Sequence, residues 1–262
     1  VGTEIPMNDI NTMWVWIPRY TYTYLYTKTP EEIKIKFESG TNSSGTINCI
    51  DAVASSGTSS QTCADANGNL KAGTSTHTHP AFTFGDDELG GLWVGKFESS
   101  ATTIPTSTST SESIVVIKPN VNALTYKALS YMFRDARQME KASNVYGFPQ
   151  SSSTTFNWNG NLTGDTNKID THIMRNAEWG AVAYLSHSKY GRCTDGTCEE
   201  ITTNNCSDKI TGIGADEVSA GQSSTTCTTD KNKYNGESGV KASTTGNVYG
   251  VYDIAGGSFE YT

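Results

Sequence analysis

The sequence predicts an α+β fold in which two helices and several short strands support long polar loops. Apolar and polar residues alternate over short runs in the first part of the chain, as they do in half-buried strands. In two later segments apolar residues recur every three or four positions, which indicates helices. Long stretches of Ser, Thr, Gly and Asn lie between these segments. We expect residues 1–262 to form a single domain that belongs to a longer polypeptide.

The predicted strands are short and are bounded by proline or by polar turns. Pro18 separates the first strand from the second, and Pro119 ends the last one. The strands cover residues 13–17, 20–26, 33–37, 81–84, 92–97 and 114–117.

Two helices and three loop insertions complete the predicted architecture. The first helix begins near Asn122, its expected N-cap, and extends to Met139. The second covers about 177–189, and Gly191 is its stop signal. The polar loop insertions lie at about 39–76, 99–113 and 192–240.

The cysteines predict disulfides in an oxidising compartment. Their number is even and all of them lie in polar loops: Cys49, Cys63, Cys193, Cys198, Cys206 and Cys227. We expect Cys49 to pair with Cys63. The other four allow three pairings, of which we favour Cys193–Cys198 with Cys206–Cys227. Zinc is the alternative, but the spacing of Cys193 and Cys198 is wide for a zinc motif and no histidine lies between residues 188 and 262.

Composition excludes several classes of protein. The net charge is −8 and the basic residues are scattered, so a nucleic-acid partner is not expected. No apolar stretch is long enough to span a membrane. The chain contains 13 Tyr, 8 Phe and 5 Trp, which argues against a disordered chain. With the cysteines, these features predict an extracellular or cell-surface protein.

Three motifs in the chain carry a resemblance to a known family. Residues 13–18 (MWVWIP) resemble an opening strand of the form M-V-x-I-P, and residues 171–179 (THIMRNAEW) resemble a helix start of the form R-L-P-T-E-A-E-W. Residues 247–261 (NVYGVYDIAGGSFEY) are similar to N-x-Y-G-L-Y-D-M-x-G-N-V-W-E-W, the longest match. In this order the motifs resemble the formylglycine-generating enzymes (sulfatase-modifying factors). The resemblance implies a C-type-lectin-like fold.

The last motif also has a physical interpretation of its own. We expect Asn247 and Gly250 to turn the backbone through unusual φ values. Gly256 and Gly257 would let the backbone cross close beneath another segment. The apolar residues of the motif are expected to be buried between the turns: Val248, Tyr249, Val251 and Tyr252.

The chain departs from the enzymes where their chemistry resides. The enzymes use a reactive cysteine pair downstream of the last motif, whereas no cysteine lies beyond Cys227 here. The tryptophan and asparagine of the motif are replaced by Phe259 and Gly257. We therefore expect a non-catalytic member of the family. The fold implied by the resemblance pairs its terminal strands, so we expect further polypeptide, or a neighbouring subunit, to supply a strand after Thr262.

Candidate metal ligands are few. The resemblance implies a calcium ion near the last motif, where Asp253 and Glu260 are the matching acids. The alternative is that both carboxylates accept hydrogen bonds from backbone N–H groups in tight turns. No other cofactor is expected. His77 and His79 share one face of an extended segment, as in half of a metal site, but we favour a role in the core or in a loop.

The sequence favours a non-catalytic recognition or adhesion domain displayed on a cell surface, a pilus or a virus particle. Loops on a rigid scaffold are where proteins usually place recognition, so we expect a protein or glycan ligand at the loop face, with exposed Tyr and Trp as anchors. The alternative is a structural subunit of an extracellular filament or pilus. Such a homo-oligomer would pack the Thr-Tyr strand at residues 20–26 between chains. A formylglycine-generating enzyme is a second alternative, which the missing cysteine pair disfavours.

Overall fold

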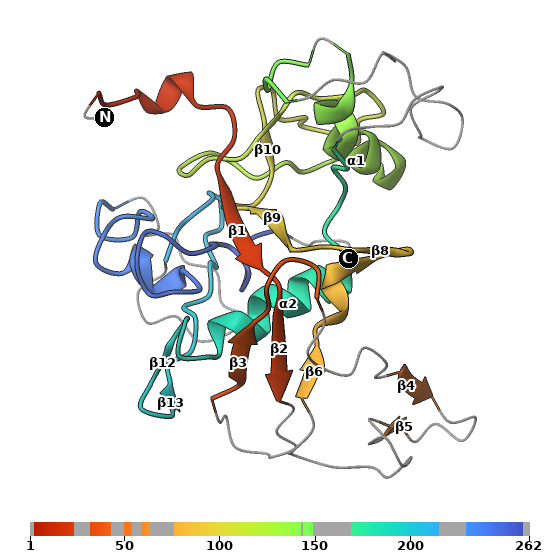
Figure 1. Cartoon of the computed structure of the whole chain (residues 1–262). Coiled ribbons are helices and arrows are strands. Elements are labelled where there is room, and N and C mark those ends of the chain that lie inside the picture. The colour runs from red at the N-terminus through yellow and green to blue at the C-terminus, as the bar shows by residue number, and fades with distance from the viewer. Residues whose placement is uncertain are drawn as a thin grey trace.

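The computed structural model describes eight ranges of the chain: residues 3–23, 32–42, 50–53, 59–62, 76–142, 144–148, 169–214 and 229–258. These residues form an α+β structure of small antiparallel sheets and two α-helices, with much irregular backbone between them (Figure 1). The α+β class predicted from the sequence is therefore confirmed. No helix among the described residues is long and apolar enough to cross a membrane.

A three-stranded antiparallel sheet and the longer helix form the first core. Strand β2 (Tyr20–Thr23) lies between β3 (Lys34–Phe37) and β6 (Thr76–Thr78). Helix α2 (Asn176–Ser186) packs against this sheet, and the Tyr20 hydroxyl donates to the Ala181 carbonyl at 2.7 Å. The buried residues of this core come from both elements and from neighbouring segments: Ile17, Tyr20, Tyr22, Ile35, Ala81, Phe82, Val94, Ala181, Val182 and Val251.

A two-stranded sheet lies next to this core. Strand β1 (Trp14–Pro18) pairs antiparallel with β9 (Gly91–Gly95), and the short hairpin of β7 (Thr83–Phe84) and β8 (Asp87–Glu88) precedes β9. Trp16 lies directly opposite Trp93, and their ring centroids are 5.2 Å apart. Both indoles are substantially exposed, whereas the adjacent Ile17 and Val94 are buried.

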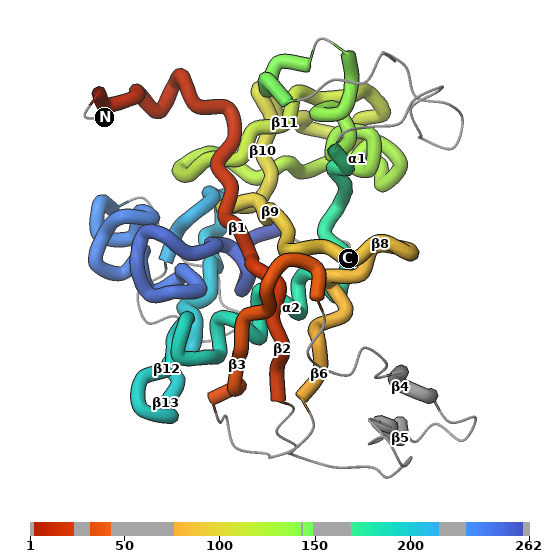
Figure 2. The backbone as a smooth tube through the Cα atoms, viewed as in Figure 1, coloured from red at the N-terminus to blue at the C-terminus, as the bar shows by residue number. Residues whose placement is uncertain are grey.

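The second core adjoins the first. Strands β10 (Ser100–Ala101) and β11 (Val115–Val116) pair there, close to helix α1 (Leu129–Ala136), as Figure 2 shows. The buried residues of this core are Phe97, Val115, Ile117, Met139, Ala242 and Tyr252. The remaining elements are a hairpin of β4 (Ile50–Val53) and β5 (Ser59–Thr62), a hairpin of β12 (Cys193–Thr194) and β13 (Thr197–Cys198), and the 3₁₀ turns Met7–Asp9, Pro80–Phe82, Arg137–Glu140 and Gly239–Ala242.

The C-terminal motif joins the two cores. Val251 is buried in the first core and the next residue, Tyr252, in the second. Gly256 passes so close to residue 204 that an added Cβ would lie 2.1 Å from the Asn204 carbonyl oxygen. The Gly257 N–H also donates to that carbonyl, at 2.6 Å. The predicted close crossing at Gly256 and Gly257 is therefore confirmed.

Two details predicted for this motif are wrong. Tyr249 is 78% exposed instead of buried. Its N–H donates to the Asn247 side chain at 2.9 Å, and the turn closed by this bond leaves the ring on the surface. Neither Asn247 nor Gly250 has a positive φ; that conformation occurs at Gly246, with φ 68°. Gly250 is required for space, because an added Cβ would lie 2.3 Å from the Ser243 hydroxyl.

The predicted helix boundaries also need correction. Helix α1 begins at Leu129 rather than near Asn122, because backbone N–H groups before it already bond to other loops: Ala123 donates to Lys209 and Leu124 to Ser99, both at 2.8 Å. Helix α2 ends at Ser186, whose carbonyl accepts the Arg192 N–H. Residues 80–82 form a 3₁₀ turn that starts at Pro80, instead of the beginning of a strand.

Candidate functional site: a pocket between two loops

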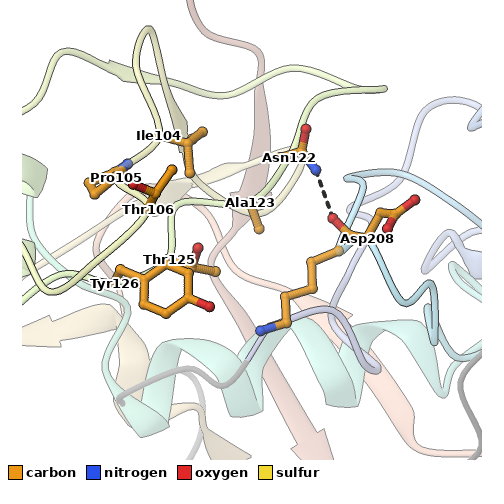
Figure 3. A pocket seen from close by; sticks show the side chains of 9 residues that line it. Ile104, Pro105, Thr106, Asn122, Ala123, Thr125, Tyr126 and Asp208 are labelled. Atoms are coloured by element: carbon orange, nitrogen blue, oxygen red, sulfur yellow. Dashed lines mark hydrogen bonds between the residues drawn. The ribbon is translucent and has the colours of Figure 1, made fainter.

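A hollow of about 380 Å³ opens between the predicted loops 99–113 and 192–240 (Figure 3). We call it the loop pocket. Segments 104–106, 122–126 and 208–209 form its wall, and these are remote from one another in the sequence. Its lining residues are Ile104, Pro105, Thr106, Asn122, Ala123, Thr125, Tyr126, Asp208 and Lys209.

The lining combines an exposed aromatic ring with polar groups. Tyr126 is 59% exposed, so its ring is available to a ligand. In Figure 3 Tyr126 and Thr125 lie on one side of the hollow, while Asn122 and Asp208 lie across it. The apolar surface between them could cover the faces of a small ligand while amide, hydroxyl and carboxylate groups fix its orientation.

Main-chain hydrogen bonds tie the two sides of the loop pocket together. Ala123 donates its N–H to the Lys209 carbonyl, and Thr211 donates to the Val121 carbonyl, both at 2.8 Å. The Asn122 side chain adds a bond of 2.8 Å to the Asp208 carbonyl. These main-chain bonds and the Asn122 side chain therefore join the two sides of the loop pocket.

Two of the lining residues have a strained backbone. Tyr126 has φ 55° and Lys209 has φ 51°, a conformation that costs a residue with a Cβ roughly 1–2 kcal/mol. The Tyr126 carbonyl accepts the Ser109 N–H at 2.8 Å, and Lys209 donates its N–H to the Cys206 carbonyl at 3.0 Å. Strain of this kind persists only where surrounding contacts impose it, and it is concentrated at functional sites.

A buried ion pair supports the Tyr126 side of the loop pocket. Lys127 Nζ lies 2.9 Å from Asp135 of α1, and both side chains are almost completely buried. Asp135 also accepts the Ser113 N–H at 2.7 Å, and Lys127 donates to the Ser113 hydroxyl at 3.0 Å. These contacts hold the end of loop 99–113 against the residue that follows Tyr126.

The cysteines are disulfide-bonded where the structure describes them. Cys193 and Cys198 form the predicted disulfide. Cys206 is also in a disulfide, next to the turn that carries Asp208 and Lys209. Cys49, Cys63 and Cys227 lie outside the described residues, as do the predicted pairings that involve them.

Asp253 has the environment of a hydrogen-bond acceptor. Its carboxylate accepts the Gly212 N–H at 2.9 Å, the Glu98 N–H at 3.1 Å and the Asn204 amide at 2.8 Å. This is the second of the two arrangements expected for this residue. Glu260, the other candidate calcium ligand, lies outside the described residues.

His77 and His79 are buried in the first core. His79 accepts the Ala81 N–H through Nδ1 at 3.2 Å and packs against Tyr20, Tyr22 and Tyr184. Burial lowers the pKa of His79 to about 4, so the ring is neutral above that pH. These contacts give His79 the core role that we favoured.

A charged cluster that the sequence did not reveal lies at the start of α2. His172 Nε2 lies 3.0 Å from Glu178 Oε1, and Nδ1 contacts the Asp170 carboxylate. Hydrogen bonds to Asp170 and Glu178 raise the pKa of His172 to about 9, against the opposing effect of burial. The Glu178 carboxylate also accepts the N–H of Arg175, which caps the start of α2.

The sequence also did not reveal a third residue near the disulfide. His187 lies beside Cys193 and Cys198, with the potential ligand atoms of all three residues within 4.8 Å of one another. His187 is one position before the range that contains no histidine, and the turn of the chain after α2 brings it close to the hairpin.

Comparison with known proteins does not assign the chain to a family. Neither a family model, nor a curated protein, nor a solved structure matches it.

Proposed function

We propose that this chain is a non-catalytic, extracellular recognition domain that binds a saccharide residue in the loop pocket. The observation that carries the proposal is Tyr126, an exposed aromatic ring held in a strained conformation at the edge of an apolar hollow. Thr125, Asn122 and Asp208 offer hydroxyl, amide and carboxylate groups to the hydroxyls of a sugar.

The proposal includes the fold and the compartment. A C-type-lectin-like fold of the formylglycine-generating type is supported by the last motif, which crosses beneath Asn204 and contributes to both cores. An oxidising compartment is supported by the Cys193–Cys198 disulfide. A protein ligand at the same loops is the other outcome that the binding test distinguishes.

The filament alternative receives less support from the described residues. Strand β2 holds the first part of the Thr-Tyr segment, and it is the central strand of its sheet. Tyr20 and Tyr22 are buried against α2 and β6 within the same chain, so their rings are not available to a second copy. If light scattering showed stable oligomers of the isolated domain, that result would favour a structural subunit of a filament.

The binding test uses a glycan array followed by titration of the best ligand in solution. Tyr126→Asn removes the ring, and Asn tolerates the positive φ of this position. We expect at least a tenfold loss of affinity, which corresponds to about 1.4 kcal/mol. Asp208→Asn should weaken binding through loss of a charged acceptor. Tyr249→Ala is the control, because Tyr249 is also an exposed tyrosine, 78% exposed against 59% for Tyr126, but lies outside the loop pocket.

Two outcomes would contradict this function. Unchanged affinity in Tyr126→Asn and Asp208→Asn would place the ligand elsewhere on the surface. Absence of binding to every glycan, together with capture of a defined protein that these variants lose, would replace the saccharide by a protein ligand.

A further inference from the structure

We propose that reduction of the Cys193–Cys198 disulfide creates a binding site for Zn²⁺, with His187 as the third ligand. The inference goes beyond the recognition function and does not depend on the loop pocket. It starts from the proximity of three potential ligand atoms, which lie within 4.8 Å of one another. Two thiolates and one imidazole are a ligand set that suits Zn²⁺, with water in the fourth position.

The hairpin that carries the two cysteines is specified without the disulfide. Cys193 and Cys198 lie directly opposite each other, and Thr194 pairs with Thr197. The turn residues Asp195 and Gly196 have φ values of 52° and 82°. Asp-Gly with two positive φ values is the preferred sequence of a type I′ turn, so the hairpin should persist when the disulfide is opened.

The position of His187 relative to the hairpin is also fixed by the backbone. His187 is the C-cap of α2 and donates its N–H to the Ala183 carbonyl at 3.1 Å. The Cys193 N–H donates to Ser188 at 3.1 Å, and the Arg192 N–H donates to Ser186 at 2.6 Å. The imidazole and the two sulfur atoms therefore stay close together in the reduced chain, and ordering of the ligands costs little on binding.

An external dithiol is the reductant that opens the Cys193–Cys198 disulfide. The dithiol gives two electrons and two protons to the S–S bond, which opens to two thiols, and the dithiol becomes its own cyclic disulfide. The ion then replaces both thiol protons, because thiolates are the ligands. Two thiolates neutralise the charge of Zn²⁺. Cys193 is buried and Cys198 is half-buried, so the sulfur of Cys198 is the more accessible to a reductant.

The test measures metal binding by the whole chain before and after reduction. The protein is reduced with the dithiol, which is removed by anaerobic gel filtration, and Co²⁺ is added as a spectroscopic probe before displacement by Zn²⁺. We expect one ion with tetrahedral cobalt–thiolate absorption that depends on Cys193, Cys198 and His187. Loss of even an indirect partner of a metal ligand weakens affinity roughly 10–100-fold, so His187→Ala should weaken Zn²⁺ binding at least that much.

Controls distinguish this site from the other cysteines. The double variant Cys193→Ser/Cys198→Ser should lose the absorption, whereas His172→Gln, a histidine change outside the site, should keep it. His187→Cys should restore binding that His187→Ala loses, which separates a missing ligand from a folding defect. The proposal is overturned if the oxidised protein binds Zn²⁺ equally well, or if His187→Ala and the double cysteine variant bind as the wild type does.

Discussion

At the residue scale, the clearest pH-sensitive group is His172. Its side chain lies between the carboxylates of Asp170 and Glu178, which raise its pKa to about 9. An unfolded chain would hold this histidine near the ordinary value of about 6.5. Below pH 6.5 both states carry the proton, and the full stabilisation by the two carboxylates is present. Between pH 6.5 and 9 only the folded state keeps the proton, so this stabilisation is progressively lost.

We expect the free energy of unfolding to fall as the pH rises from 6.5 to 9. One pKa unit corresponds to about 1.4 kcal/mol, and Asp170 is half-exposed, so after allowance for solvent screening we expect a decrease of about 2 kcal/mol. Urea unfolding at a series of pH values measures it. His172→Gln should be less stable than the wild type at pH 6 and should show a flatter profile up to pH 9. An equally steep profile in the variant would assign the pH dependence to other groups.

At the element scale, the C-terminal motif depends on close backbone approach at Gly256. This glycine has φ 88°, and an added Cβ would lie 2.1 Å from the Asn204 carbonyl oxygen. Gly85 in the β7–β8 turn has φ 63°, but an added Cβ would meet nothing within 4 Å. The two positions therefore share the conformational strain and differ in the clash.

The pair Gly256→Ala and Gly85→Ala separates these two effects. We expect Gly85→Ala to lower the free energy of unfolding by about 1–2 kcal/mol, the cost of a positive φ. Gly256→Ala should lose a further 1–3 kcal/mol, roughly, because the backbone must shift to make room. Chemical denaturation of both variants gives the comparison. Equal losses of unfolding free energy in the two variants would mean that the backbone at Asn204 moves aside without an energetic cost.

Much of the architecture could be predicted from short-range patterns, and the parts that could not depend on long-range pairing. The Cys193–Cys198 disulfide and the crossing at Gly256 follow from local sequence. The start of α1 does not, because the N–H groups of Ala123 and Leu124 bond to residues far away in the chain. Two walls of the pocket come from the predicted recognition loops 99–113 and 192–240. The predicted helix that starts near Asn122 includes Tyr126, and no local signal indicates the positive φ of this residue.

At the scale of the whole molecule, Asp253 connects segments that are remote in the sequence. It accepts hydrogen bonds from Glu98, Asn204 and Gly212, and it follows Tyr252 of the second core. Asp253 also has φ 60°, which Asn tolerates. Asp253→Asn therefore keeps the backbone conformation while replacing one acceptor oxygen by an NH₂ group that faces buried donors.

We expect Asp253→Asn to lower the free energy of unfolding by about 1–3 kcal/mol, the cost of leaving a buried polar group unsatisfied. Thermal unfolding with and without chelator completes the experiment. Because N–H groups already occupy the Asp253 carboxylate, chelator should not change the Tm of the wild type. A rise in Tm on addition of calcium would instead support an ion at this motif.

The backbone hydrogen bonds that frame the loop pocket allow its binding preference to change by substitution of side chains. The bonds that join its two sides run mainly between main-chain atoms of residues 121–123 and 209–211, and such bonds form whatever side chains these positions carry. Ile104, Thr106 and Thr125 line the hollow without contributing to that frame. Substitutions at these three positions can therefore change the surface that a ligand meets, while the backbone geometry of the loops stays the same.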